Sequence, residues 1–316
     1  MFAFAWFVYW LDRYEKEPKI LLGVVFVWGA VVAAGVAYVV NTALGLGLYY
    51  VTGSETITEF ATGSLVAPPV EETLKGMAVL LVFLIFRQEF DSILDGIVYA
   101  GIVALGFAAT ENSYYIYHFG FLENGWMGLL FLVFVRVILV GWQHPFYTAF
   151  IGIGFATARL NRNWAIKLMV PFIGLAVAVI AHSMHNTLAS LLSGVGGLVV
   201  GTVMDWSGWL FMFLVILWAV FREQRRLRDH LHEEVVFGVI SPTQYRTACS
   251  AWAQFGARTA AFFDGKFRDT GRFYQVCAEL AHKKHQRATL GEEGGNTQII
   301  INLRSELARL SKNVKG

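Results

Sequence analysis

Long apolar runs dominate the first two thirds of the chain. They occur at about 20–40, 65–86, 92–117, 126–160, 166–193 and 198–221. Each is close to or above the roughly 20 residues that a helix needs to cross a bilayer. The pattern predicts an all-α fold, a polytopic transmembrane helical bundle. We expect seven membrane segments, or eight if 126–160 crosses twice.

Composition supports a membrane protein, since 56% of the 316 residues are hydrophobic and 15% are charged. The character changes after Phe221. Residues 222–316 hold 16 of the 25 Lys and Arg against 10 of the 23 Asp and Glu, a balance of +6. We therefore predict a transmembrane core over 1–221 and a basic, helical and soluble cytoplasmic tail over 222–316.

Basic residues predict the orientation, because short loops rich in Lys and Arg stay cytoplasmic. The connections around 41–64, 118–125 and 194–205 contain no Lys or Arg and are expected outside. The predicted inner face is marked by the tail and by Arg13, Lys16, Lys19, Arg87, Arg159, Arg162 and Lys167. This alternation requires 126–160 to make one net crossing, and Pro145 predicts a break at His144.

Two smaller features complete the outline. Met1–Leu11 is apolar but, at about 16 Å as a helix, too short to span. It lacks the basic start of a signal peptide, so we do not expect cleavage. Cys249 and Cys277 lie in the predicted cytoplasmic tail without metal-ligand spacing, and we interpret them as ordinary residues.

Ionisable and amide side chains interrupt three of the apolar runs at similar predicted depth. An ionised group inside a membrane is costly and is by default a candidate functional site. On separate helices, these three groups could converge on one chamber open to the outer face. They are Glu71, Glu72 and Lys75; Glu111 and Asn112; and His182, His185 and Asn186, with Gln143 and His144 as a fourth group of unassigned depth.

Each group also has a simpler interpretation. Pro68 and Pro69 suit a helix start, where carboxylates are favoured. Glu111 could be interfacial and His182 structural. Lys75, four residues after Glu71, shares its helix face and provides a partner. The recurrence of three polar groups at one depth favours a functional site.

The residue types restrict the chemistry. The chain has no Gly-x-Ser-x-Gly, no cysteine in the membrane runs and no His-Glu-x-x-His. What remains is carboxylate, imidazole and amide, the set that activates water. One of the two adjacent glutamates would take a proton from water, while His182 and Asn186 would supply hydrogen-bond donors to the developing oxyanion. Peptide-bond hydrolysis is the leading hypothesis.

Two alternatives stay open. A transporter could use the same Glu and His residues as a proton or cation relay, although no inverted repeat is evident. For the hydrolase, we favour a metal-independent mechanism with no cofactor, because Lys75 supplies positive charge. Zinc held by the Glu and His cluster remains an alternative on ligand type.

The motifs together resemble the PrsW family of intramembrane proteases, within the wider CAAX-protease and bacteriocin-processing superfamily. The resemblance covers about 1–195 and rests on Asp12–Pro18, Glu71–Lys75, Asp95–Tyr99, Phe107–Asn112, His144 and His182. It implies a glutamate-dependent protease of a bacterial cell membrane that makes the first, outer-side cut in a single-span substrate such as an anti-sigma factor. It also implies catalytic roles for Glu71, Glu72 and His182, with Lys75, Glu111, Asn112, His144 and Asn186 in support.

The tail is predicted to be helical. Ser241 and Pro242 indicate a helix start, and Asp264–Gly265 its end. Phe273, Val276, Cys277 and Leu280 follow helical spacing in the next segment. Gly291–Gly295 should be a linker before a final amphipathic helix over Ile299–Leu310. No nucleic-acid-binding motif is present, so the expected partners are the bilayer and the substrate.

Overall fold

The computed structural model describes residues 1–11, 14, 16–192, 194–292 and 294–314. Within these ranges all regular structure is helical and no strand occurs. Two compact units are present. The membrane unit comprises Met1–Trp10, Glu17–Arg159 and Asn163–Val215, and the tail unit comprises Leu11–Lys16, Leu160–Arg162 and Ile216–Gly316. Arg13 and part of the Asp12–Pro18 motif lie outside the described residues.

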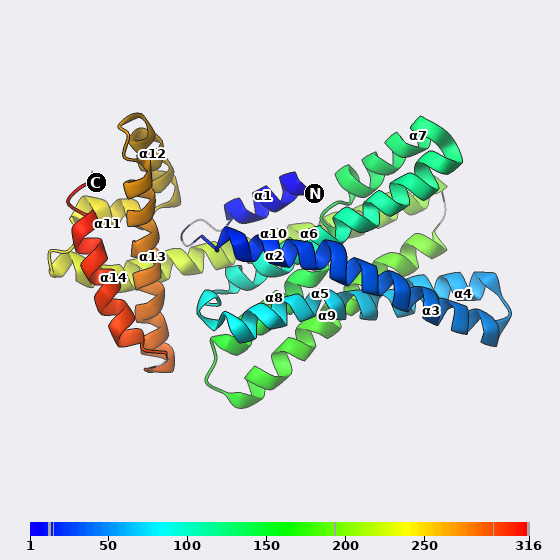
Figure 1. The fold of residues 1–316 in the computed structure, drawn as a ribbon, viewed down its shortest axis with the longest axis horizontal. Coiled ribbons are helices and arrows are strands. Elements are labelled where there is room, and N and C mark those ends of the chain that lie inside the picture. Colours follow the sequence, from blue (N-terminus) through cyan, green and yellow to red (C-terminus); the bar gives the residue numbers. More distant parts are fainter. Residues whose placement is uncertain (12–13, 15, 193, 293, 315–316) are drawn as a thin grey trace. The chain divides into compact units, whose positions relative to one another are not determined.

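The first half of the membrane unit is a helical hairpin preceded by a short helix (Figure 1). Gly53, at φ 60°, ends its first arm, and Ser54 caps the second by accepting a hydrogen bond from Ile57 N. The predicted outer connection 41–64 is therefore largely helical. The elements are α1 (Phe2–Leu11), α2 (Lys19–Val27), the π-helical turn η1 (Trp28–Ala33), α3 (Ala34–Thr52), α4 (Glu55–Ala61), the π-helical turn η2 (Thr62–Val66) and α5 (Ala67–Ile85).

A second run of helices follows a short 3₁₀ turn. Its first helix starts at a capping box formed by Ser92 and Asp95. Gly125, at φ 60°, reverses the chain. The elements are η3 (Arg87–Glu89), α6 (Ile93–Tyr115), the π-helical turn η4 (Ile116–Phe121), α7 (Leu122–Val133), the π-helical turn η5 (Phe134–Leu139) and α8 (Gln143–Arg159).

The predicted break at His144 is wrong in position. The helical path is interrupted at 140–142, and His144 already belongs to α8. Pro145 lies in the first turn of that helix, where a missing N–H leaves no intrahelical bond unmade. The proline therefore marks the start of the second piece rather than the break.

The last helices of the membrane unit are α9 (Trp164–Leu191) and α10 (Gly194–Val236), which continues into the tail unit. Within the described residues, four helical runs are long and apolar enough to cross a membrane: Lys19–Thr52, Ile93–Arg159, Trp164–Leu191 and Gly194–Val236. These runs fit an integral membrane protein. α5 carries three ionisable residues and is not among them, and the count of seven or eight segments stays a prediction.

α6 is the central helix, buried around its whole circumference from Ile93 to Ala108. It packs against α8 through glycine. A Cβ on Gly96 would lie 2.2 Å from Gly152 O, and one on Gly152 would lie 1.9 Å from Gly96 O. The two backbones are thus in direct contact, as small residues allow at membrane-helix crossings. α8 also packs extensively on α9.

The tail unit contains the end of α10 and four further helices. Phe273, Val276, Cys277 and Leu280 are all fully buried, which confirms their predicted helical face. The single helix expected from Ser241 to Asp264 is wrong, because a break at Cys249 and Ser250 divides it and the Ser250 side chain caps the second piece. The helices are α11 (Pro242–Ala248), α12 (Ala251–Phe263), α13 (Phe267–Leu290) and α14 (Asn296–Leu310).

Candidate active site

Glu71 and Glu72 lie in the middle of a helical path, not at its start. The path runs from α4 through η2 into α5, and the wider π turn lies just before Pro68 and Pro69, which have no N–H to donate. Glu71 is 7% exposed and Glu72 is fully buried. An interfacial helix start therefore does not describe this carboxylate pair.

Every oxygen of the Glu72 carboxylate has a partner. Oε1 lies 2.6 Å from Lys75 Nζ and 2.9 Å from His182 Nδ1, and Oε2 accepts a hydrogen bond of 2.8 Å from Thr148 Oγ1. Lys75 is fully buried and lies 3.9 Å from Glu71 Oε2. Its closest partner is therefore Glu72, whereas the sequence predicted Glu71.

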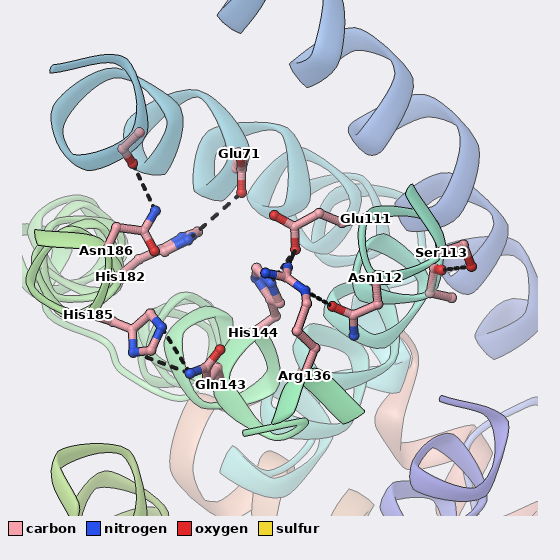
Figure 2. Close-up of polar contacts among 12 residues, drawn as sticks. Glu71, Glu111, Asn112, Ser113, Arg136, Gln143, His144, His182, His185 and Asn186 are labelled. Atoms are coloured by element: carbon pink, nitrogen blue, oxygen red, sulfur yellow. Dashed lines mark hydrogen bonds and ion pairs between the residues drawn. The ribbon is translucent and has the colours of Figure 1, made fainter. Parts of the chain in front are cut away.

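Only one oxygen of the Glu71 carboxylate accepts a hydrogen bond from the described residues. Asn41 Nδ2 donates to Oε1 at 3.4 Å, whereas the buried Oε2 accepts no hydrogen bond from the described residues. Oε2 faces Nε2 of His182 across 3.9 Å (Figure 2). This gap is too long for a hydrogen bond and short enough for one bridging species.

His144 and Glu111 form the opposite wall. His144 Nε2 lies 2.8 Å from Glu111 Oε2, and its Nδ1 lies 3.2 Å from Lys75 Nζ. Arg136 holds the wall in place by donating to Glu111 Oε2 at 3.1 Å and to Asn112 Oδ1 at 2.8 Å (Figure 2). Asn112 thus helps to orient Arg136, which in turn holds Glu111.

The carboxylates determine how both imidazoles are oriented. An ionised carboxylate only accepts hydrogen bonds, so His182 carries its hydrogen on Nδ1 toward Glu72 and His144 carries its hydrogen on Nε2 toward Glu111. Nε2 of His182 is then left as an acceptor, and Nδ1 of His144 accepts from Lys75 Nζ. Glu71, His144 and His182 each present one ligand atom within 4.8 Å of the others, and all three residues are buried. Electron-pair donors from three helices therefore face one small space.

Two predicted residues lie elsewhere. Asn186 Nδ2 donates to Gly63 O on η2 at 2.8 Å and so joins α9 to η2. His185 Nδ1 lies 3.0 Å from Asp205 Oδ1, beside Gln143. Neither the Asn186 amide nor the His182 Nδ1–H points toward Glu71 Oε2. The oxyanion donors expected from the sequence are thus directed to other partners.

The structure adds residues that sequence reasoning missed. Arg136 is the only Lys or Arg between positions 88 and 158, and Asp205 is the only acid in the run 198–221. A lone charge in an apolar run predicts a buried partner, so both had a readable signal. Thr148 and Asn41 are uncharged and carry no such signal.

Comparison with known proteins agrees with this architecture. A polytopic helical protein with a buried carboxylate and imidazole chamber fits an intramembrane hydrolase. The model of the PrsW family of intramembrane metalloproteases matches residues 17–221, and the chain belongs to this family. It is accordingly a membrane protease.

Curated relatives point the same way. The chain is 27% identical to Protease PrsW of Bacillus subtilis (strain 168) over 214 residues, which are 67% of this chain and 84% of that protein. It is 25% identical to Protease PrsW of Geobacillus kaustophilus (strain HTA426) over 239 residues, 73% of this chain and 89% of that protein. No solved structure matches.

Proposed function

We propose that this chain cleaves a peptide bond of a single-span membrane protein in the chamber formed by Glu71, Glu72, Lys75, His144 and His182. The observation that carries the proposal is the pair Glu71 Oε2 and His182 Nε2, which face each other across 3.9 Å beside His144. Two acceptors directed at one space require a species that donates hydrogens or accepts electron pairs. Water fits this need, and water is the second substrate of hydrolysis.

Glu71 is the proton acceptor in this mechanism. Its Oε2 has no hydrogen-bond partner among the described residues, so it can take a proton from water. Glu72 is fully bonded and acts by holding His182 and Lys75 in place. Lys75 supplies the positive charge for the oxyanion that forms as water attacks the scissile carbonyl.

A metal is the second candidate, and the family description together with the donor set supports it. The site fits zinc, which takes two histidines and a carboxylate in catalytic centres. Each histidine donates its other N–H to a carboxylate, as metal-bound histidines usually do. Glu71, His144 and His182 would hold the ion. When bound, it would polarise water and the scissile carbonyl.

The net charge of the site favours binding of a cation or a proton there. The site contains three carboxylates, from Glu71, Glu72 and Glu111, and two cations, Lys75 and Arg136. With both imidazoles neutral, one negative charge is uncompensated among these five groups. Such a charge costs several kcal/mol at membrane depth.

The test is cleavage of single-span substrates, including an anti-sigma factor as the substrate we propose, in proteoliposomes. Glu71→Gln should lower kcat by about 10²–10⁴, because glutamine keeps the volume and cannot accept a proton. Glu72→Gln should also lower kcat, because it removes the negative charge that holds Lys75 and His182 in place. Glu123→Gln, an exposed acid on α7, is the matched control. Near-wild-type cleavage by both site variants would contradict the glutamate mechanism.

Zinc is tested on the same preparation. Under the metal-independent mechanism, dialysis against a strong chelator leaves kcat unchanged and elemental analysis finds no stoichiometric ion. If activity is lost and stoichiometric zinc restores it, with the bound ion detected, the metal candidate replaces Glu71 as sole activator of water.

A further inference from the structure

A cavity of about 1010 Å³ extends from the chamber along the helical hairpin of the membrane unit. Its lining residues come from α3, α4, η2, α5, α6 and η4. Small and aromatic residues line it, among them Ala37, Gly45, Tyr49 and Tyr114. Its size is that of sites that enclose whole ligands. Glu71 and Glu111 are among the lining residues, so the cavity reaches the proposed catalytic groups.

The charge of this groove has one sign. Among the described residues that line it are Glu55, Glu59, Glu71 and Glu111, and none of these described lining residues is Lys or Arg. Glu55 and Glu59 are four residues apart on α4 and share a helix face. Both are exposed, and neither makes an ion pair or side-chain hydrogen bond within the described part of the chain. The mouth of the groove thus offers two free carboxylates.

Buried polar atoms of the lining residues also lack partners. Within the described residues, Asn41 Oδ1, Thr62 Oγ1 and Glu71 Oε2 are buried and form no hydrogen bond. Glu71 is 7% exposed, so the groove is lined by a side chain more than nine-tenths buried, one oxygen of which forms no hydrogen bond. Such atoms are costly to leave unbonded. An extended peptide presents free N–H groups that could satisfy them, whereas an intact helix bonds its own.

We infer that this groove binds the unwound outer end of a membrane-spanning helix whose outer flank carries Lys or Arg. Glu55 and Glu59 contact the cationic flank, while the apolar walls hold the segment that leads to Glu71. The inference rests on the proposed protease function. It names a restrictive substrate class, because outer flanks of membrane helices are usually poor in Lys and Arg.

The spacing of Glu55, Glu59 and Glu71 predicts how far the basic flank lies from the scissile bond. Glu59 and Glu55 precede Glu71 by 12 and 16 residues on a helical path, which corresponds to about 18 and 24 Å. An extended chain covers about 3.3 Å per residue. The basic residues should therefore lie about five to seven positions outward from the scissile bond.

The kinetic test uses synthetic single-span peptides in proteoliposomes with the full chain. The cleavage site is first determined by mass spectrometry with a Gln-Gln outer flank. A second peptide carries Lys-Lys six positions outward from the scissile bond. A third peptide carries Lys-Lys twelve positions further outward than the second. Glu55→Gln/Glu59→Gln should raise KM for the second peptide about three- to tenfold at low salt and leave kcat unchanged. Glu123→Gln is the control.

The other peptides distinguish recognition from a structural effect. Glu55 lies in the first turn of α4, where a carboxylate also stabilises the helix. Loss of that role would affect all three peptides equally, whereas loss of recognition affects only the second. Glu55→Lys/Glu59→Lys should reverse the preference toward a Glu-Glu flank. Equal KM values for all flanks in the wild type would overturn the inference.

Photo-crosslinking separates this inference from the protease function. A benzophenone side chain at Tyr49, which lines the groove, should crosslink the Lys-Lys peptide, whereas one at Tyr50, 87% exposed and outside the groove, should not. Crosslinking at 49 without cleavage would contradict the protease and retain the groove. Cleavage with equal or no crosslinking at the two positions would contradict the groove and retain the protease.

Discussion

Asp205 Oδ1 lies 3.0 Å from Nδ1 of His185, so α10 contributes a buried carboxylate beside α9. Its other oxygen accepts a hydrogen bond of 2.7 Å from Gln143 Nε2. Gln143 immediately precedes His144, and His185 lies one turn after His182. Asp205 therefore holds the two segments that carry His144 and His182, whose imidazoles we propose to be catalytic.

Asp205→Asn should reduce kcat by up to about 10-fold, less than the roughly 10- to 100-fold typical of losing a direct partner of an active-site histidine, because Asp205 acts through His185 and Gln143. The substitution keeps the volume but gives one of the two contacts a donor where an acceptor is needed. Ser207→Ala, an exposed change on the same helix, is the control. Unchanged kcat in Asp205→Asn, measured by proteoliposome cleavage, would show that the contact is dispensable.

Lys75→Met should destabilise the membrane unit by about 3–5 kcal/mol, because it leaves the buried Glu72 carboxylate without its cation. Lys75 also lies 4.2 Å from the Phe107 ring centroid, a contact that methionine partly preserves. The measurement is chemical unfolding in detergent. Lys167→Met, which changes an exposed lysine, should have little effect.

A double variant tests the reason for that loss. Glu72→Gln removes the stranded charge, so Lys75→Met/Glu72→Gln should be more stable than the sum of the two single losses predicts. Strictly additive losses would mean that the Lys75–Glu72 pair does not stabilise the fold as an ion pair.

The proposed orientation predicts labelling from opposite sides. Leu122→Cys and Gly196→Cys should react with a membrane-impermeant thiol reagent from outside, and Ser305→Cys on α14 only from the cytoplasm. The background should be low because Cys249 and Cys277 are 5% and 0% exposed. Cytoplasmic labelling at 122 or 196 would contradict both the orientation and an outer-side cut.

The tail unit should lose stability as pH falls from about 6.5 to 4. Burial, with the positive charge of Arg226 and the nearby His230, lowers the pKa of His285 to about 4. The unfolded chain, with a histidine pKa near 6.5, then binds more protons than the folded one in this window. The neutral His285 therefore makes its full contribution to the stability of the tail unit above about pH 6.5.

His285→Gln removes this titration and should reduce the acid sensitivity. Hydrogen exchange of α13 peptides, compared between wild type and variant at one pH, measures the effect in the full chain. We expect similar protection at pH 7.5 and greater protection of the variant, relative to wild type, at pH 5. The same difference at both pH values would exclude His285 as the cause.

The sequence predicted the features that depend on the spacing of apolar residues and on residue type. Apolar length located the helical runs, and ionisable residues at matching depth indicated that Glu71, Glu111 and His182 meet. It could not predict which atoms pair, because this depends on helix rotation and on the register between helices. Lys75 is the clearest case, since the three- and four-residue spacings both lie on its face and only packing selects Glu72.

Breaks in the helices were harder to place than the helices themselves. Pro145 was interpreted as a break because proline restricts the residue before it, yet a first-turn proline is equally compatible with a helix. The Ser250 cap was missed for a related reason, since a serine between two helix-forming stretches gives a weak signal. The role predicted for Asn186 was a hydrogen bond inside the chamber, whereas its amide bonds the Gly63 carbonyl. This partner is a backbone group that no side-chain pattern reveals.

The contact between Gly96 and Gly152 restricts the paths by which solvent, lipid and substrate fragments can move through the protein. Because the backbones of α6 and α8 touch there, neither solvent nor a lipid chain can pass between these two helices at that level. The groove is lined by the buried Glu71 and also by the exposed Glu55 and Glu59, where it reaches the surface. We therefore expect the outer fragment of a cleaved substrate to leave by the path along which it arrived, so that product release, and not only entry, depends on the walls of that groove.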